Sequence, residues 1–138
     1  MHDRFALHYD PEAFNIAGQK LLGRQSAGVG LLRALAQEGT PGELGCFTAD
    51  RRHADACLAA LREDGYAGEL SWLAPSRPQD LKRYGCLYHP GVDIERLAWQ
   101  RLRLDDRDYS LCGVVHNVAS HEMMNTVTGL LTAPVRGW

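Results

Sequence analysis

Short apolar runs recur along the chain, and each is bounded by glycine, proline or polar residues. Runs of this length with such boundaries are typical of β-strands. The run LCGVV is apolar without interruption, which indicates a strand that is covered on both of its faces. The predicted strands are Phe5–Tyr9, Leu44–Thr48, Leu70–Ala74, Cys86–His89 and Leu111–Val115.

Between these runs, apolar residues recur at the spacing of one face of an α-helix, so that each segment would bury one side. Asp93 precedes the third of these patterns and Ser120 the fourth, and both residue types are favoured as helix N-caps. The four predicted stripes are Ala27, Leu31, Ala34 and Leu35; Ala54, Cys57, Leu58 and Leu61; Ile94, Leu97, Ala98 and Leu102; and Met123, Met124, Val127, Leu130 and Leu131.

The alternation of strand and helix predicts an α/β fold in which parallel strands are joined by right-handed crossovers. We therefore expect a doubly wound, mostly parallel sheet. One connection departs from the pattern: PSRPQDLKRYG, from Pro75 to Gly85, holds two prolines and leaves room for only a turn or so of helix. We expect this connection to be irregular.

The composition is that of one globular domain over residues 1–138, since 45% of the residues are apolar and 23% are charged. The formal net charge is -2, and no stripe of basic and aromatic residues tracks a phosphate backbone, so no nucleic-acid partner is expected. No apolar run approaches the roughly 20 residues that span a bilayer. The N-terminus MHDRFALHYD also lacks the apolar segment of a secretion signal, which predicts a cytoplasmic protein without a transmembrane segment.

The four cysteines are widely spaced, and three of them lie inside apolar segments. This favours reduced, buried thiols that pack as small hydrophobic groups, over a disulfide framework or a metal site. The cysteines are Cys46, Cys57, Cys86 and Cys112.

A glycine-rich stretch, GRQSAGVG, runs from Gly23 to Gly30 and leads into the first predicted helix. Gly23 and Gly28 match the first positions of a P-loop, but Val29 and Gly30 occupy the places of its lysine and hydroxyl residue. A dinucleotide fingerprint that began at Gly28 would require a small residue where Arg33 stands. Both nucleotide motifs therefore fail, and a glycine-rich loop between strand and helix remains.

Two interpretations of this loop stay open. At the carboxyl edge of a parallel sheet, a helix N-terminus offers unpaired N–H groups to an anion, with Arg24, Gln25 and Ser26 beside it. Alternatively, the glycines only permit a tight turn and close helix packing. The 16 residues from Asp10 to Gln25 form a long connection with little periodicity, and long connections are often functional.

Three segments together resemble the N-terminal part of bacterial glycosyltransferase family 4 proteins of the GT-B type: GRQSAGVGLLRAL, YSLCGVVHNVASHEMM and LLTAPVRGW. The resemblance covers nearly the whole chain. It implies a Rossmann-like domain, the N-terminal half of a GT-B fold, which mainly binds the acceptor. In that family a second domain binds the nucleotide-sugar donor, and sugar transfer needs no essential metal or other cofactor.

The resemblance also assigns roles to individual residues. The stretch Gly23–Gly30 would border the donor phosphates and the acceptor, and His116 would face the transferred sugar as the catalytic residue. Independently, the polar HNVASH stretch follows a buried strand, where an α/β sheet places ligand contacts, which makes Asn117, Ser120 and His121 candidate substrate-binding residues. A histidine that only bonds to the backbone or faces solvent is the open alternative. The spacing of His116 and His121 does not suit a helical metal pair, so no metal is expected.

The sequence departs from the family in one respect, because none of its glutamates forms the E-x7-E pair of the family's donor-binding domain. We therefore expect the chain, which ends at Trp138, to be truncated before that domain, to be inactive in isolation, and to self-associate through an uncovered sheet edge. Two functions remain open: the acceptor-side domain of a nucleotide-sugar-dependent glycosyltransferase, and a noncatalytic α/β module that binds a small anion or a partner protein.

Overall fold

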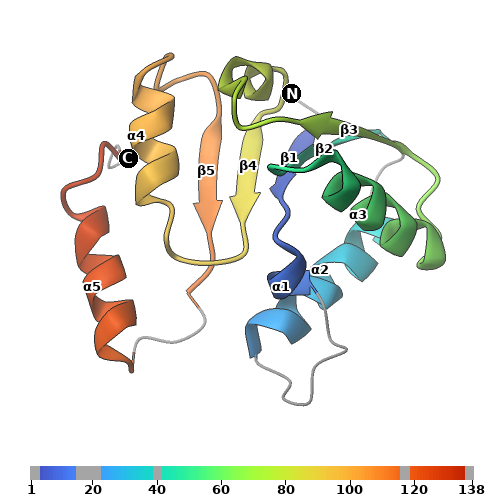
Figure 1. Cartoon of the computed structure of the whole chain (residues 1–138), viewed down its shortest axis with the longest axis horizontal. Helices are drawn as coiled ribbons and strands as arrows, with labels where there is room; N and C mark the ends of the chain where they lie inside the picture. Colours follow the sequence, from blue (N-terminus) through green and yellow to red (C-terminus); the bar gives the residue numbers. More distant parts are fainter. Residues whose placement is uncertain (1–3, 15–22, 39–41, 116–118, 136–138) are drawn as a thin grey trace.

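Five parallel strands form a single sheet in the computed structural model of the chain, which describes residues 4–14, 23–38, 42–115 and 119–135. The strand order is β3-β2-β1-β4-β5, as Figure 1 shows. The doubly wound, Rossmann-like α/β fold predicted from the alternation is confirmed. The strands are β1 (Phe5–His8), β2 (Glu43–Phe47), β3 (Glu69–Leu73), β4 (Cys86–His89) and β5 (Ser110–Gly113), each within two residues of a predicted run.

Helices form over all four predicted stripes, but α5 does not bury its stripe: Met124 is 57% exposed and Leu131 is 85% exposed. The short α1 was not predicted. Asp50 caps α3 by accepting a hydrogen bond from the Arg52 N–H, and Ser120 caps α5 by accepting one from the Met123 N–H at 3.1 Å. The helices are α1 (Pro11–Phe14), α2 (Gly23–Glu38), α3 (Arg51–Glu63), the 3-10 helix η1 (Pro78–Arg83), α4 (Glu95–Leu102) and α5 (His121–Leu130). The short η1 confirms that the connection between β3 and β4 is irregular.

Two details of the helix starts differ from expectation. Helix α2 begins at Gly23, so the glycine-rich stretch Gly23–Gly30 forms its first two turns instead of a loop. Asp93 does not cap α4, whose N-cap position is Ile94, because the Asp93 carboxylate is hydrogen-bonded to the His89 ring.

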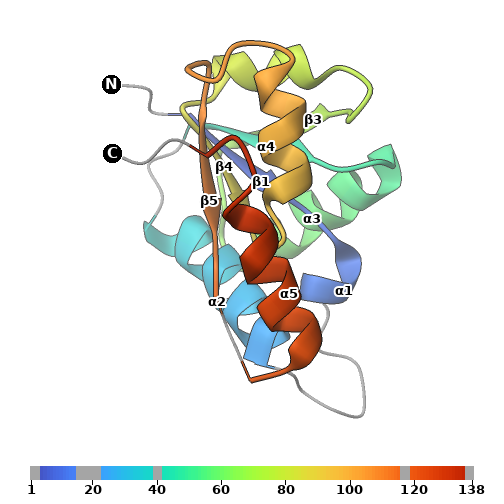
Figure 2. The same ribbon diagram turned by 90° about the vertical axis from the view of Figure 1, so that its left-hand side faces the viewer.

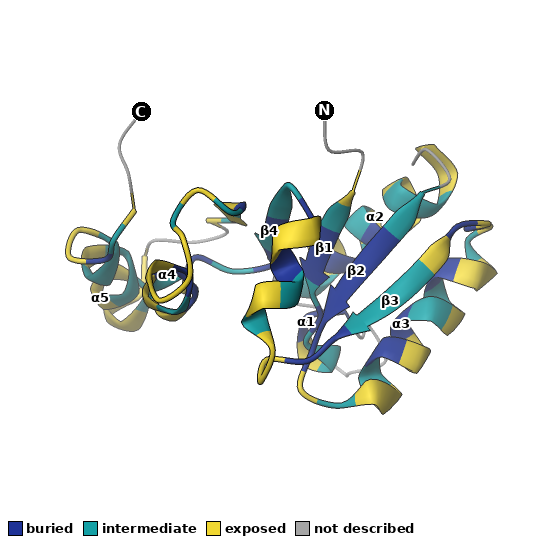
Figure 3. Cartoon of the chain, turned by 90° about the horizontal axis from the view of Figure 1, so that it is seen from above, coloured by how far each residue is buried: buried dark blue, intermediate teal, exposed yellow. Residues whose placement is uncertain are grey.

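Alternate residues of β1, β2, β3 and β4 enter two separate apolar clusters, one on each face of the sheet, whereas β5 contributes only the partly buried Leu111 to one of them. Leu7 and Cys46 pack with α1, α2 and α3, whereas Ala6 and Phe47 pack with η1 and α4. Figure 3 shows the burial concentrated in the central strands, with exposed residues on the outer sides of α3 and α4.

The prediction that the run LCGVV is covered on both faces is wrong, because β5 is an edge strand that packs only on the side of η1 and α4. Ser110, Cys112 and Gly113 of β5 are exposed, and Val115 after it is 56% exposed.

Helix α5 lies beside α4 in both Figure 1 and Figure 2, and it contributes no buried residue. A Cβ at Gly129 would meet only the end of the flexible Glu95 side chain of α4. None of the helices in the described residues is long and apolar enough to cross a membrane.

Gly28 and Gly30 lie two residues apart in α2 but have different surroundings. A Cβ at Gly28 would overlap the Ala13 carbonyl oxygen of α1 and lie 3.0 Å from Phe14 Cδ1, whereas a Cβ at Gly30 would meet nothing within 4 Å. The close contact between α1 and α2 therefore requires the first glycine and not the second.

Alanine at these two positions is expected to change stability in opposite directions. Gly28→Ala should lower the free energy of unfolding by roughly 1–3 kcal/mol, because α1 must move away from α2. Gly30→Ala should raise it by up to about 1 kcal/mol, because alanine loses less backbone entropy in a helix. Urea denaturation of both variants measures the difference, and equal effects would contradict the packing role of Gly28.

Candidate functional site

The sheet changes its direction of winding between β1 and β4. The chain first moves from β1 to β2 and β3 on one side, and then crosses back to β4 and β5 on the other side. In open parallel sheets, the crevice at the carboxyl ends of two such strands is where ligands bind. In this chain each of the two strands ends in a histidine, His8 on β1 and His89 on β4.

Both histidines point to the same face of the sheet. His8 follows Ala6 by two residues and His89 follows Leu87 by two, and both apolar residues pack in the cluster beside η1 and α4. Phe47 lies opposite His8 in the register of β1 with β2 and belongs to the same cluster. The three side chains therefore form a continuous floor next to α4.

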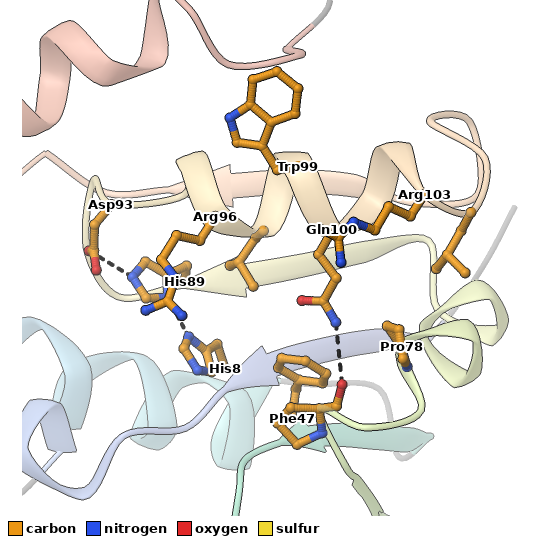
Figure 4. A pocket seen from close by; sticks show the side chains of 12 residues that line it. His8, Phe47, Pro78, His89, Asp93, Arg96, Trp99, Gln100 and Arg103 are labelled. Atoms are coloured by element: carbon orange, nitrogen blue, oxygen red, sulfur yellow. Dashed lines mark hydrogen bonds and ion pairs between the residues drawn. The ribbon is translucent and has the colours of Figure 1, made fainter.

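A cleft of about 700 Å³ lies above this floor, as Figure 4 shows. One wall is α4, with Arg96, Gln100 and Arg103, and the other is the segment after β3, with Pro75 and Pro78. Gln100 Nε2 spans the cleft and donates a hydrogen bond to the Pro75 carbonyl oxygen at 3.5 Å. The cleft is of the size that small-molecule sites usually have.

Three side chains form a hydrogen-bonded chain at one end of the cleft. The Nδ1 atoms of His8 and His89 lie 2.5 Å apart, and His89 Nε2 lies 2.8 Å from Asp93 Oδ1. The His89 side chain is only 10% exposed, whereas that of Asp93 is 67% exposed. The chain therefore runs from a solvated carboxylate through a buried ring to His8.

The Asp93 carboxylate determines which ring nitrogens of the two hydrogen-bonded histidines carry protons. Because an ionised carboxylate only accepts hydrogen bonds, we assign the proton of a neutral His89 to Nε2. His89 Nδ1 then accepts a hydrogen bond from His8 Nδ1–H, which leaves the Nε2 atom of His8 with a free lone pair. A Cβ at Gly91 would lie 2.5 Å from Asp93 Oδ1, so the turn after β4 needs glycine to place this carboxylate.

His8 is neutral at pH 7. Burial is the main cause that lowers its pKa to about 4, and the neighbouring His89 lowers it as well, while Asp10 and Asp93 act in the opposite direction. A neutral imidazole with a free lone pair can accept a proton or a hydrogen bond from a ligand hydroxyl.

Several of the site residues that were predicted from the sequence make structural contacts. Gly28 packs against α1, Gln25 Nε2 donates to the Glu12 carbonyl oxygen at 3.2 Å, and Ser120 caps α5. Gly23, Ser26 and Gly30 lie in the first turns of α2, and His121 is the exposed first residue of α5. The side chain of Arg24, and His116 and Asn117 entirely, lie outside the described residues.

The described candidates do not line the cleft beside α4. They share its edge of the sheet, because the starts of α2 and α5 lie toward the carboxyl ends of the strands in Figure 1. The binding roles predicted for these residues stay predictions, and the residues that meet in the cleft are different ones.

Sequence reasoning missed His8, His89 and Asp93. A signal was present, because the apolar runs FALH and CLYH both end in histidine, as the run GVVH does at His116. In the part of the chain that the structure describes, no group of three histidine, cysteine or carboxylate side chains could hold a metal ion. Comparisons with protein-family models, with curated proteins and with solved structures found no match.

The low pKa of His8 predicts a loss of stability in mild acid. Unfolded chains take up a proton on this residue near pH 6.5, whereas the folded protein does so only near pH 4, so the unfolded state binds more protons between these values. The free energy of unfolding should therefore decrease as the pH falls from about 6.5 to 4.

Urea denaturation at several pH values in this range tests the assignment. His8→Gln should show a smaller decrease than the unchanged protein, and His121→Gln, which alters an exposed histidine, should show the same decrease as the unchanged protein. If His8→Gln retained the full pH dependence, the assignment to His8 would be wrong.

Proposed function

We propose that this chain is the acceptor-side domain of a nucleotide-sugar-dependent glycosyltransferase. The observation that carries the proposal is the neutral His8, held by His89 and Asp93 at the carboxyl edge of the sheet and open to a cleft of about 700 Å³. A glycosyl acceptor reacts through a hydroxyl group, and His8 Nε2 is the atom that can receive the hydroxyl proton.

The proposed proton path follows the hydrogen-bonded chain. As the acceptor oxygen bonds to the anomeric carbon of the donor, the bond from that carbon to the phosphate oxygen breaks and its electron pair leaves with the nucleoside diphosphate. The hydroxyl proton passes to His8 Nε2, and the proton on His8 Nδ1 moves to His89 Nδ1. The Asp93 carboxylate then stabilises the positive charge on His89 through Nε2–H.

The resemblance to glycosyltransferase family 4 supports the same assignment. It implies that His116 faces the transferred sugar, and that the stretch Gly23–Gly30 borders the donor phosphates. Asn117, Ser120 and His121 would complete that side of the site. A second, donor-binding domain is part of this proposal, and the chain alone would bind acceptor without transferring sugar, since the reacting atoms meet only between two domains.

One observation favours the second candidate, a noncatalytic α/β binding module. The contacts of Gly28 and Gln25 with α1 account for this part of the glycine-rich stretch by packing alone. A module of this kind would keep the cleft and its ligand but would not need His8 as a proton acceptor.

Transfer kinetics of the protein in which this domain is joined to a donor-binding domain distinguish the two candidates. His8→Gln and His116→Ala should each lower kcat at least about tenfold, or roughly 1.4 kcal/mol in activation free energy. His53→Gln on α3, outside the cleft, is the matched control and should retain the activity of the unchanged protein.

The isolated 138-residue chain provides the complementary experiment. Assayed against a panel of nucleotide sugars and acceptors, it should transfer no sugar, and repeated turnover would contradict its role as one half of a site. If the two-domain protein also transferred no sugar, the binding module would be the better description.

A further inference from the structure

We propose that the acceptor bound in the cleft carries a phosphate group, which Arg96 and Arg103 of α4 hold. The identification of the ligand as an acceptor rests on the proposed function, whereas the recognition of a phosphate does not. Three observations carry the inference: the position of the two arginines on α4, the absence of acidic partners for them among the described residues, and the apolar surface of Phe47, Pro75 and Pro78 across the cleft.

The two arginines share one side of α4. Arg96, Gln100 and Arg103 are separated by four and three residues, the spacing that aligns side chains along a helix, and all three line the cleft. In Figure 4, Arg96 extends from α4 toward the histidines, and Arg103 runs along the helix toward Gln100. Leu97 and Ala98 are buried and fix this rotation of the helix.

The charges of these arginines are not neutralised within the described part of the chain. Some arginines elsewhere pair with carboxylates, such as Arg33 with Asp64 at 3.4 Å and Arg83 with Glu43 at 3.4 Å. No such ion pair joins Arg96 or Arg103 to a described acidic residue. Asp93 also lines the cleft, but its carboxylate is hydrogen-bonded to His89.

The position of the arginines suits a ligand with an anionic end and a polar body. Arg96 lies in the first turn of α4 and Arg103 follows its last residue, so their backbones are roughly 10 Å apart along the axis. Phe47 and the two prolines Pro75 and Pro78 provide apolar surface across the cleft, on which a sugar ring can pack. His8 lies at the floor, where the reacting hydroxyl would bind.

A phosphate fits this wall better than a neutral group. Guanidinium groups bind phosphate oxygens through paired N–H donors. Gln100 lies between the two arginines, and its Nε2 has one N–H besides the one that it donates to the Pro75 carbonyl oxygen. A phosphomonoester could belong to a soluble sugar phosphate or to a lipid headgroup, because both present the same oxygens to α4. The experiment therefore includes both sources.

Calorimetric titration of the 138-residue chain with glucose 6-phosphate and with glucose tests the inference. The phosphorylated sugar should bind at least tenfold more tightly, and Arg96→Gln and Arg103→Gln should each weaken its binding at least fivefold. Arg33→Gln removes the same charge from α2, outside the cleft, and should leave the affinity unchanged. Circular dichroism of every variant verifies that the fold is retained.

A parallel titration with vesicles that contain phosphatidic acid distinguishes the two sources of phosphate. If the chain bound the vesicles but not glucose 6-phosphate, and Arg96→Gln and Arg103→Gln each abolished vesicle binding, the phosphate would belong to a lipid. Recognition of the phosphate by α4 would then still hold. Equal affinity for glucose and glucose 6-phosphate without vesicle binding, or variants that behave as Arg33→Gln does, would overturn the inference.

These titrations contain no donor, so their outcome is independent of the proposed function. Phosphate-dependent binding without any transfer by the two-domain protein would support the anion site and contradict the glycosyltransferase. Transfer to neutral acceptors that Arg96→Gln and Arg103→Gln leave unchanged would contradict the anion site and support the glycosyltransferase.

Discussion

The segment that joins β3 to β4 has to pass over β2 and β1 to reach its place in the sheet, and it has only residues 74–85 in which to do so. Two prolines and the 3-10 helix η1 occupy this length, so this segment supplies no full helix, and η1 and α4 share the face. Tyr84 covers the sheet over Gly45, where a Cβ would lie 2.9 Å from the tyrosine ring. The last strand positions, at His8 and Phe47, are left to form the floor of the cleft beside α4.

The same short crossover explains how histidines come to lie within a well-packed domain. A polar ring at the end of β1 loses solvation, which lowers the pKa of His8, and hydrogen bonding to His89 compensates for part of that loss. Asp93 completes the chain at the cost of a helix cap, because its carboxylate is directed to His89 instead of the first turn of α4. Gly91 leaves room for the Asp93 carboxylate. His8, His89, Gly91 and Asp93 therefore all contribute to one hydrogen-bonded arrangement, although they are not adjacent in the sequence.

The elements of the fold were predictable from the sequence, because apolar runs and helical stripes are local patterns. The order of the strands was not predictable, because the alternation of strands and helices indicates parallel pairing but does not specify that β1 lies between β2 and β4. His8 and His89 are 81 residues apart in the chain, and only that order makes them neighbours. The sequence could not decide between the two interpretations of Gly28 for a similar reason, because its contact with Ala13 depends on a four-residue helix that has no periodic signal.

The central claim is that His8 is a neutral ring whose Nε2 lone pair is available to a ligand in the cleft. Long-range ¹H–¹⁵N correlation spectra of the histidine rings at pH 7 observe this directly, because protonated and unprotonated ring nitrogens resonate at different frequencies. We expect His8 to carry its proton on Nδ1, and its Nε2 resonance to shift when a sugar ligand binds. A doubly protonated His8, or one that carries its proton on Nε2, would contradict this claim.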